Sequence, residues 1–443
     1  MDEKLVMKLL EAKQYRTIKE AFSFMNEVDL AELLEKLPEK QMIMAFRLIR
    51  KKEAAQTFSY MEPRQQQVLV EALTERELRE VIDDMFLDDA ADLLEEMPAN
   101  VVERILSNTD AETRRQLNAL LSYPEDSAGS MMTVEYVDLR PQMTVSASLE
   151  KIRRVGIDSE TIYTCYVIQN RELLGIVTAK SLLISDERKT VEEIMETNLV
   201  TVQTHDDQEA VAKAFRKYGL LAIPVVDREG CMVGIVTVDD AMEVMEEEAT
   251  EDITLMAAVA PSEEDYFNTS IFRHALNRLP WLLILMFSAT FTGMILTYYE
   301  NAFAAVPLLV SFIPMVMDTS GNCGSQSAAL IIRGMAVDDI HLGDVFRVLW
   351  KELRVALMVS VTLGIANGIR VYIMYRQLQL AVLIAVTLVC TVSIAEFIGC
   401  MLPMLAKRVG LDPALVASPL ITTCVDAAAI AIYFYIATLL FGL

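Results

Sequence analysis

The chain has 443 residues, more than one small hydrophobic core accounts for, so we expect two or more domains. Its net charge of −24 is unevenly distributed along the chain. Residues 273–443 hold 10 Lys+Arg and 9 Asp+Glu, whereas the first 272 residues hold 29 Lys+Arg and 54 Asp+Glu. Simple electrostatic binding to nucleic acid or anionic lipid is therefore excluded, and six cysteines without a CxxC pair indicate neither a disulfide framework nor a zinc site.

Residues 1–125 are predicted to form a helical domain in the cytosol. The opening MDEKLVMKLLEAKQ lacks the apolar run of a signal peptide. A loose repeat follows (DLAELLEKLPEKQ, EAAQTFSYMEPRQ, DAADLLEEMPANV), in which Pro38, Pro63 and Pro98 each mark a break and the start of a new helix. Stacked helix pairs of an α-helical solenoid are the expected fold, and no catalytic set is visible.

Residues 126–246 change to an α/β pattern with two units, 126–188 and 189–246. The stretches YVIQNRELLGIVTAKSLL and PVVDREGCMVGIVTVDDAM each predict a strand, a turn, a second strand GIVT and a helix. This arrangement resembles a pair of CBS domains, a regulatory fold. The resemblance implies that Thr237 and Asp240, in a T-x-x-D pattern, contact the ribose of an adenine nucleotide such as ATP, whereas Ser181 replaces the acid in the first unit.

An acidic connecting helix is expected within residues 238–272. Between Arg228 and Arg273 there are 12 acidic residues and no Lys, Arg or His. Like charges along one helix repel each other unless something neutralises them, and hard divalent cations bind carboxylate oxygens. Two interpretations stay open: a solvated face that keeps the protein soluble, or a sensor that reports cation concentration to the segment that follows.

Residues 273–443 are predicted to form an all-α membrane domain, since each crossing needs about 20 mostly apolar residues. The five candidate spans are 280–299, 302–332, 355–375, 380–405 and 413–441. The second is broken by prolines and by Gly321 and Gly324. Eight Lys and Arg residues flank the predicted spans on one side and two on the other, and the richer side is expected to face the cytosol. This places the N-terminus in the cytosol and the C-terminus outside a cell (inner or plasma) membrane.

The last predicted span contains one formal charge, Asp426. A charge at the centre of a lipid-facing helix costs roughly 2.5–3.5 kcal/mol. Ser418, Thr422 and Asp426 are spaced by four residues and share one face, as do Asn322 and Gln326 in the glycine-rich stretch of the second span. The pattern favours a cation path lined by these residues, with a structural polar contact and simple helix packing as the alternatives.

The order of these parts resembles the MgtE magnesium transporters over essentially all 443 residues, most specifically in SGNCGSQSAALIIRG and DPALVASPLITTCVD. The resemblance implies a homodimer whose second and fifth spans line the pore, with Asp426 as the pore acid and Ser418 where relatives often carry Asn. It also implies that cytosolic Mg²⁺ bridges the N domain, the CBS pair and the connecting (plug) helix, and so holds the pore shut. By motif position this regulatory role falls on Asp88, Asp207, Glu209, Asp240, Glu243, Glu248, Glu251 and Asp252. Gln56 and Gly219 stand where some relatives carry acids.

These residues favour a Mg²⁺ channel or transporter over an enzyme. Two copies of Asp426 about a two-fold axis match the charge of one divalent ion, and a few oxygen ligands suit hydrated Mg²⁺. His205, His274 and His341 lie outside the predicted spans, which disfavours zinc, copper or nickel as cargo. No GxxxxGK[ST] loop indicates an ATP-driven pump, and a 100 mV potential already supplies about 4.6 kcal/mol for inward movement of a divalent cation.

Two alternative functions stay open at this point. The first is a proton- or sodium-coupled transporter of a divalent cation such as Co²⁺ or Mn²⁺, regulated by adenine nucleotide at the CBS pair, in which Asp426 is a proton relay. The second is a nucleotide-sensing membrane receptor without transport. Such a receptor has no need of Asn322, Gln326 and Asp426.

Overall fold

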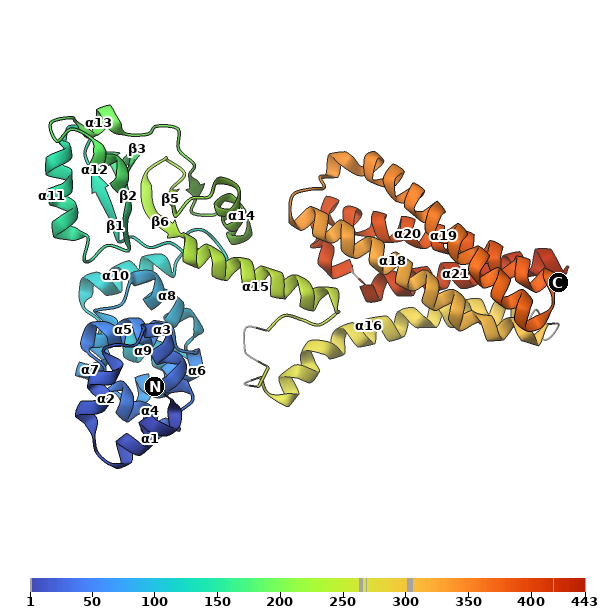
Figure 1. Cartoon of the computed structure of the whole chain (residues 1–443), viewed down its shortest axis with the longest axis horizontal. Coiled ribbons are helices and arrows are strands. Elements are labelled where there is room, and N and C mark those ends of the chain that lie inside the picture. The colour runs from blue at the N-terminus through green and yellow to red at the C-terminus, as the bar shows by residue number, and fades with distance from the viewer. Residues whose placement is uncertain (1, 263–265, 268, 301–305, 417, 443) are drawn as a thin grey trace. The chain divides into compact units, whose positions relative to one another are not determined.

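The computed structural model describes residues 2–262, 266–267, 269–300, 306–416 and 418–442. The chain divides into two compact units, Met1–Glu246 and Glu247–Leu443 (Figure 1). Each unit has its own hydrophobic core and is described separately.

The first unit begins with a bundle of short helices, which confirms the predicted helical N domain. Side chains of Asp2, Asn26, Thr74 and Asp110 accept backbone N–H groups at helix starts. The three prolines of the repeat also lie where they were expected, at the starts of α4, α6 and α9. The helices are α1 Glu3–Glu11, α2 Tyr15–Phe22, α3 Glu27–Glu35, α4 Glu39–Phe46, α5 Lys51–Ser59, α6 Pro63–Ala72, α7 Glu75–Ile82, α8 Leu87–Glu96, α9 Ala99–Asn108 and α10 Ala111–Leu120.

Two small sheets with the same topology follow, which confirms the paired α/β units. In each sheet the first strand pairs in parallel with the second, and the second pairs antiparallel with the third. The strands are β1 Tyr136–Leu139, β2 Thr161–Gln169, β3 Glu172–Thr178, β4 Val202–Gln203, β5 Ala222–Val226 and β6 Met232–Thr237. The helices around them are α11 Val145–Val155, α12 Ala179–Ile184, α13 Val191–Ile194 and α14 Gln208–Tyr218.

The glycine of each GIVT strand is required by the backbone of a segment that packs against it. A Cβ on Gly175 would lie 2.9 Å from the carbonyl oxygen of Glu196, and a Cβ on Gly234 would lie 2.7 Å from the carbonyl oxygen of Thr133. The sulfur atoms of Met195 and Met132 lie comparably close to the two positions, at 2.9 Å and 2.8 Å. Both units therefore repeat a glycine on which a methionine-containing segment packs.

The acidic segment forms helix α15, Val238–Met256. It is shorter than the expected range 238–272, because the helix ends at Met256 and the next helix, α16, begins only at Ile271. The buried Leu255, near the end of α15, packs against Ala328 and Ile421 in a core cluster of the second unit. The last turn of the acidic helix is therefore apolar on one side.

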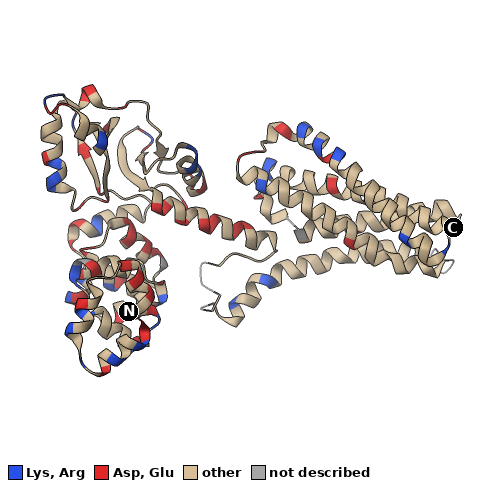
Figure 2. Cartoon of the chain, viewed as in Figure 1, with Lys and Arg blue, Asp and Glu red and all other residues tan. Residues whose placement is uncertain are grey.

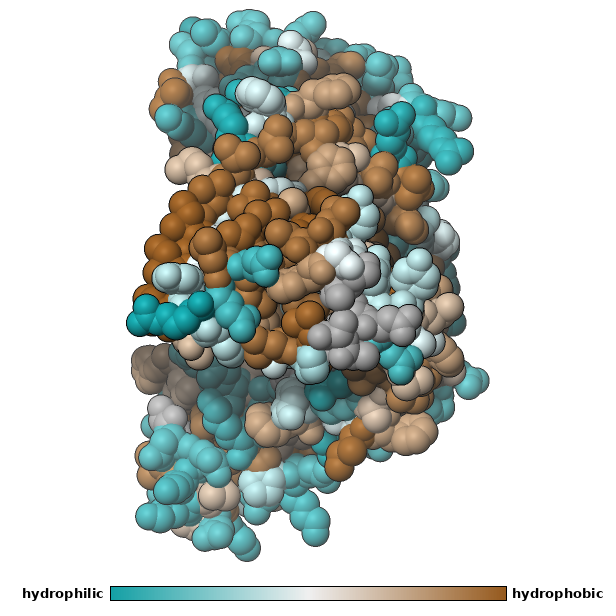
Figure 3. Space-filling model, turned by 90° about the vertical axis from the view of Figure 1, so that its right-hand side faces the viewer, coloured by the Kyte–Doolittle hydropathy of each residue, from teal (hydrophilic) through white to brown (hydrophobic). Residues whose placement is uncertain are grey.

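The second unit is a bundle of long helices that corresponds to the predicted membrane domain. Figure 2 shows few charged residues along most of its length, and Figure 3 shows mostly apolar side chains over the end of the bundle that faces the viewer. Its elements are α16 Ile271–Tyr298, η1 Pro307–Phe312, α18 Ile313–Ala336, η2 Leu342–Asp344, α19 Val345–Tyr375, α20 Leu378–Arg408, η3 Pro413–Val416 and α21 Ser418–Phe441.

Four helices of the described residues are long and apolar enough to cross a membrane: α16, α19, α20 and α21. Helix α18 covers most of the second predicted span, but it contains a polar stretch and is not one of these four helices. It nevertheless packs along α20 and α21. This span was expected to be interrupted, and it is interrupted before Ile313, where η1 precedes the helix. The expected breaks at Gly321 and Gly324 are wrong, because α18 runs through both glycines.

These glycines allow close helix packing instead. A Cβ on Gly399 of α20 would collide with the carbonyl oxygen of Gly324 on α18, so the two backbones are in direct contact. A Cβ on Gly324 would in turn lie 3.1 Å from the carbonyl oxygen of Ala395. Small residues on both helices are therefore a packing requirement at this crossing.

We expect Gly399→Ala to destabilise the full chain by about 1–3 kcal/mol, the usual cost of overpacking a tight contact. Gly293→Ala in α16 is the matched control, since nothing lies within 4 Å of a Cβ built there. Alanine at that position should be neutral or should stabilise the helix by about 0.5–1 kcal/mol. Thermal unfolding in detergent measures both, and equal melting temperatures for the two variants would refute the contact.

Candidate pore face and acidic cluster

Asp426 lies on α21 where this helix packs against α18. A Cβ on Gly321 of α18 would be 3.0 Å from Cγ2 of Thr422 and 3.6 Å from Oδ1 of Asp426. The hydroxyl groups of Ser325 and Thr422 are 3.3 Å apart and link the same two helices. Gly321 thus leaves room for a polar seam between α18 and α21.

The Asp426 carboxyl group is half-buried in this seam. Within the described part of the chain, its Oδ1 atom is buried and has no hydrogen-bond partner. A carboxylate in an apolar helix is costly unless a cation or a donor compensates it. Asp426 therefore has the burial and the free oxygen of a ligand-binding group.

Asn322 and Gln326 lie on an exposed side of α18 in the single chain, and Asp318 lies one turn before Asn322 on that side. Asp318 is close enough to Asp426 for their charges to interact. The sequence analysis missed Asp318 as a site residue, although its spacing of four from Asn322 was a signal. Ser418 was also predicted to line the cation path, but its side chain lies outside the part of the chain that the structure describes.

A second concentration of acids lies in the first unit, between α8 and the start of α15. Asp88, on α8, is buried, with 8% of its surface exposed. Burial, followed by repulsion from Asp89 and Asp240, raises its pKa well above the usual range. We call Asp88, Asp89, Asp92, Glu160, Asp239, Asp240 and Glu243 the acidic cluster, because their charges act on one another.

Asp89, Asp92 and Glu160 show the same pattern. Burial is the largest cause and repulsion from Asp240 the second, and together they raise the pKa of Asp89 to about 6 and those of Asp92 and Glu160 to about 8. Across the described residues, no three His, Cys, Asp or Glu side chains already converge as a metal site. The cluster is therefore a set of repelling carboxyl groups that needs protons or cations, and not a finished metal cage.

Sequence reasoning identified only part of this cluster. It named Asp88, Asp240 and Glu243, and it missed Asp89, Asp92, Glu160 and Asp239. The D-D-x-x-D pattern at the start of α8 was a signal for Asp89 and Asp92. No local signal pointed to Glu160, because it joins the cluster only through the packing of the α/β unit on the helical domain.

Other predicted regulatory residues have local partners. The Asp207 side chain caps α14 by accepting the Glu209 N–H at 3.0 Å, and Glu209 pairs with Lys213 at 2.5 Å. Glu248, Glu251 and Asp252 lie further along α15, within the second unit. The regulatory set of the sequence analysis is thus distributed over three different environments.

The T-x-x-D pattern has a structural role at the start of α15. The Thr237 hydroxyl donates to Oδ2 of Asp240 at 2.6 Å, and the Thr237 backbone N–H reaches the same oxygen at 3.3 Å. In the first α/β unit the hydroxyl groups of Thr178 and Ser181 are 2.8 Å apart. Capping alone accounts for these residues, so nucleotide binding stays a prediction.

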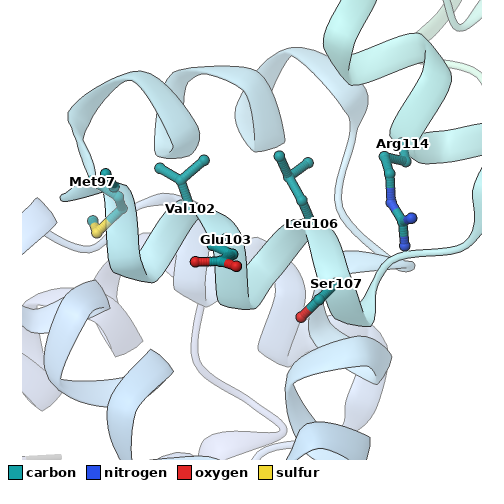
Figure 4. A pocket seen from close by; sticks show the side chains of 7 residues that line it. Met97, Val102, Glu103, Leu106, Ser107 and Arg114 are labelled. Carbon is teal, nitrogen blue, oxygen red and sulfur yellow. The ribbon is translucent and has the colours of Figure 1, made fainter.

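A hollow of about 640 Å³ in the helical domain offers no comparable chemistry. Met97, Val102 and Leu106 line it with apolar side chains, and Glu103 and Arg114 carry its only two charges (Figure 4). One acid and one base do not make a divalent cation site.

Comparison with known proteins now decides the family. Residues 313–436 match the family described as "Divalent cation transporter", residues 25–126 match the "MgtE intracellular N domain", and residues 191–247 match the CBS domain. The chain is 39% identical to "Magnesium transporter MgtE" of Thermus thermophilus, over 99% of both chains. The chain belongs to the MgtE magnesium transporter family.

Further relatives agree with this membership. "Magnesium transporter MgtE" of Bacillus subtilis is 31% identical, over 97% of this chain and 95% of that protein. A structure described as "Crystal structure of the cytosolic domain of the Mg2+ channel MgtE in complex with ATP" is 37% identical, with a TM-score of 0.51, and covers 54% of this chain and 99% of its own. The first unit therefore has a solved MgtE counterpart that was crystallised apart from a membrane domain.

Proposed function

We propose that this chain forms a Mg²⁺ channel that lets Mg²⁺ enter the cell down its electrochemical gradient. The observation that carries the proposal is Asp426, a half-buried carboxyl group at the seam of α18 and α21 whose Oδ1 atom has no hydrogen-bond partner among the described residues. Membership of the MgtE family supplies the identity of the ion. Uptake of Mg²⁺ into liposomes that contain the purified chain tests the proposal directly.

The pore is proposed to lie between two copies of the chain. Asp318, Asn322 and Gln326 form an exposed polar face on α18, and polar side chains at membrane depth normally face water or protein. A two-fold dimer that pairs this face would place two Asp426 carboxylates near one axis, and their charges would balance one divalent ion. Mg²⁺ sheds water reluctantly, so amide, hydroxyl and carboxylate groups would contact its hydrated form.

Cysteine substitutions test whether this face lines a pore. In a background without native cysteines, Asn322→Cys and Gln326→Cys should react with a water-soluble thiol reagent, and added Mg²⁺ should slow the reaction at least several-fold. Ile365→Cys is the matched control and should not react, because Ile365 is an exposed apolar residue of α19, outside the polar face of α18. Inertness of both test positions, with and without Mg²⁺, would leave helix packing as the explanation.

The acidic cluster is proposed to sense cytosolic Mg²⁺ and to close the pore. Without cations, Asp88, Asp92 and Asp240 repel one another across α8 and α15, which opposes close packing of these elements. Bound Mg²⁺ would cancel this repulsion and favour the packed arrangement. Binding shifts the equilibrium only if Mg²⁺ prefers the closed state, so the acids must be close together only there. The predicted roles of Asp207, Glu209, Glu248, Glu251 and Asp252 belong to the same proposal.

The raised pKa values predict how the stability of residues 1–246 depends on pH. Asp89, Asp92 and Glu160 bind protons more tightly in the folded unit than in the unfolded chain, where such groups have a pKa of about 4. Their contribution to stability is therefore complete below about pH 4 and is lost as the pH rises through about 6 and then 8. Millimolar Mg²⁺ should replace the lost protons.

Thermal unfolding of this fragment measures the effect. Without divalent ions, the melting temperature should be lower at pH 8 than at pH 5 by about 5 °C or more, and Mg²⁺ should recover most of this difference. Asp89→Asn with Asp92→Asn should flatten both responses. A melting temperature that stays constant with pH and Mg²⁺ in the unmodified fragment would contradict a cation-sensing cluster.

Adenine nucleotide binding and membrane orientation complete the proposal. The relative crystallised with ATP supports binding of ATP to the CBS pair here, with Thr237 and Asp240 toward the ribose. In that case the ribose would compete with the hydrogen bonds between these two residues. The excess of Lys and Arg on one side of the bundle supports cytosolic N-terminal domains and a C-terminus outside the cell membrane.

A further inference from the structure

A hollow of about 250 Å³ lies between α19 and α20, away from the residues of the candidate pore. Six of the eight side chains that line it are apolar: Phe346, Leu349, Trp350, Leu353 and Ala356 of α19 and Phe397 of α20. Phe346, Trp350 and Phe397 are 87%, 62% and 54% exposed. The hollow is therefore an apolar groove that opens at the surface of the membrane unit, and we call it the groove.

The groove is as long as one leaflet of a membrane is thick. It follows α19 from Phe346 to Ala356, which is about 15 Å at 1.5 Å per residue. Half of a hydrocarbon core of about 30 Å has the same thickness. Because α19 is one of the helices that are long and apolar enough to cross a membrane, an acyl chain has room to lie along it here.

The two polar side chains of the groove already have hydrogen bonds. The Ser327 hydroxyl of α18 donates to Oε2 of Glu352 at 2.7 Å, which draws this carboxylate toward α18. The Ser393 hydroxyl donates to the Val389 carbonyl oxygen at 2.7 Å. The rest of the wall is hydrocarbon, so the lining suits an acyl chain and does not suit water or an ion.

Three bases run along α19 beside the groove. Arg347, Lys351 and Arg354 are spaced by four and three residues and share one face of the helix, and we call them the basic stripe. The Arg354 guanidinium donates to the Trp350 carbonyl oxygen at 3.3 Å, so the stripe borders the groove at Trp350. All three bases are exposed, and no ion pair with an acid involves them in the part of the chain that the structure describes.

The charges around the stripe leave it positive. Asp344, at the start of α19, accepts the His341 backbone N–H at 3.3 Å, and Glu352 is held from α18. The acidic first 272 residues do not attract anionic lipid, but residues 273–443 carry 10 bases and 9 acids, and three of these bases gather here. The net charge of the whole chain therefore does not exclude an anionic lipid at this face.

We propose that the groove binds an anionic phospholipid of the membrane, with an acyl chain along the apolar wall and the phosphate at the basic stripe. Arginine binds phosphate through paired N–H groups, and lysine adds a point charge. Tryptophan is enriched where hydrocarbon meets the headgroups, which is the place of Trp350 between groove and stripe. Basic pockets between membrane helices commonly hold such headgroups.

A second copy of the chain fits this face less well than a lipid does. In a two-fold dimer the same patch meets itself, so two basic stripes would approach each other and repel. A lipid phosphate balances the stripe instead. The groove lies on α19 and α20 and the candidate pore on α18 and α21, so the inference does not depend on Asp426.

The two tryptophans of the chain, Trp281 and Trp350, allow the lipid to be located. Trp281→Phe leaves Trp350 as the only indole in the full chain. In phosphatidylcholine liposomes, phosphatidylglycerol with brominated acyl chains should quench this fluorescence at a several-fold lower lipid fraction than phosphatidylcholine with the same brominated chains. Trp350→Phe leaves Trp281 on α16, which should be quenched equally by both lipids.

Two variants of the Trp281→Phe chain test the stripe and the groove separately. Changing all three bases of the stripe to glutamine should remove the preference for phosphatidylglycerol. The matched control changes three exposed bases elsewhere in the unit to glutamine and should keep it: Arg273, Arg278 and Arg376. Ser393→Leu should fill the groove and weaken the preference several-fold, whereas Thr362→Leu, at an exposed position of α19 outside the groove, should not.

Equal quenching of Trp350 by the two lipids would overturn the inference. Quenching of Trp281 but not of Trp350 would also overturn it, because a second copy or another protein would then cover the groove. A preference that survives Ser393→Leu would limit the contact to the headgroup and contradict the groove. The comparison of the two lipids needs no change at the stripe, so it decides the question even if the glutamine variant does not fold. Each of these outcomes leaves the proposed Mg²⁺ channel untouched.

Discussion

Asp426→Asn should reduce Mg²⁺ uptake by at least about 100-fold, because it removes the charge that attracts the ion at the seam of α18 and α21. A loss of about 2.8 kcal/mol in ion binding corresponds to that factor. Asp426→Ala should abolish Mg²⁺-dependent growth of a strain that lacks other importers. The asparagine keeps the size of the side chain, so loss of uptake in that variant reports charge and not packing.

Asp339→Asn is the matched control for this experiment. Asp339 is an exposed carboxylate in the loop after α18, and the same chemical change there should leave uptake unchanged. Expression must be equal in all strains. Normal growth rescue by Asp426→Ala would show that Asp426 is a structural polar contact, the alternative that the sequence left open.

Neutralising Glu248, Glu251 and Asp252 together should leave the channel open at Mg²⁺ concentrations that close the wild-type protein. These acids lie on α15, which continues from the acidic cluster into the second unit. If Mg²⁺ bridges them in the closed state, amides at these positions remove the energy that favours closure. Cells that express the triple variant should become sensitive to external Mg²⁺, and patch-clamp recordings should show at least a tenfold higher Mg²⁺ concentration for half-closure.

A control with the same loss of charge separates bridging from a general electrostatic effect. Glu39, Glu71 and Glu187 are exposed and lie outside the acidic cluster, so their triple change to glutamine should leave closure unchanged. Removal of residues 1–125 should weaken closure less than the α15 variant does, because only some bridges lose their partner. Closure of the α15 variant at the wild-type Mg²⁺ concentration would make this helix a solvated spacer.

The elements with strong periodicity could be predicted from the sequence. The GIVT strands, the proline-marked helices and the apolar spans all depend on local patterns, and the structure has them in the expected order. The apolar character of α20 is a good example, because 31 residues form one helix that a hydropathy pattern identifies without any tertiary information. The continuity of α18 was harder to predict, because glycines predict both helix breaks and close packing, and only the contact with Gly399 decides between them.

The candidate sites could be predicted only where the signal was local. Asp426 was visible because it is isolated in an apolar segment. The basic stripe of α19 gives a local signal as well, because its three bases are spaced by four and three residues, and the sequence analysis used them only for orientation. Glu160 had no such signal, since its neighbours in the cluster come from α8 and α15. Composition identifies an acidic region, and tertiary packing alone decides which acids repel one another.

The most direct test of the proposed function is Mg²⁺ flux through the purified chain. Liposomes that contain the full chain are loaded with a Mg²⁺-sensitive dye, and a potassium gradient with valinomycin makes the interior negative. Mg²⁺ should enter without ATP and without a proton or sodium gradient, faster at more negative potential, and Asp426→Asn should abolish the signal. Flux that requires a proton or sodium gradient would show a coupled transporter, and no flux from correctly folded protein would contradict a channel altogether.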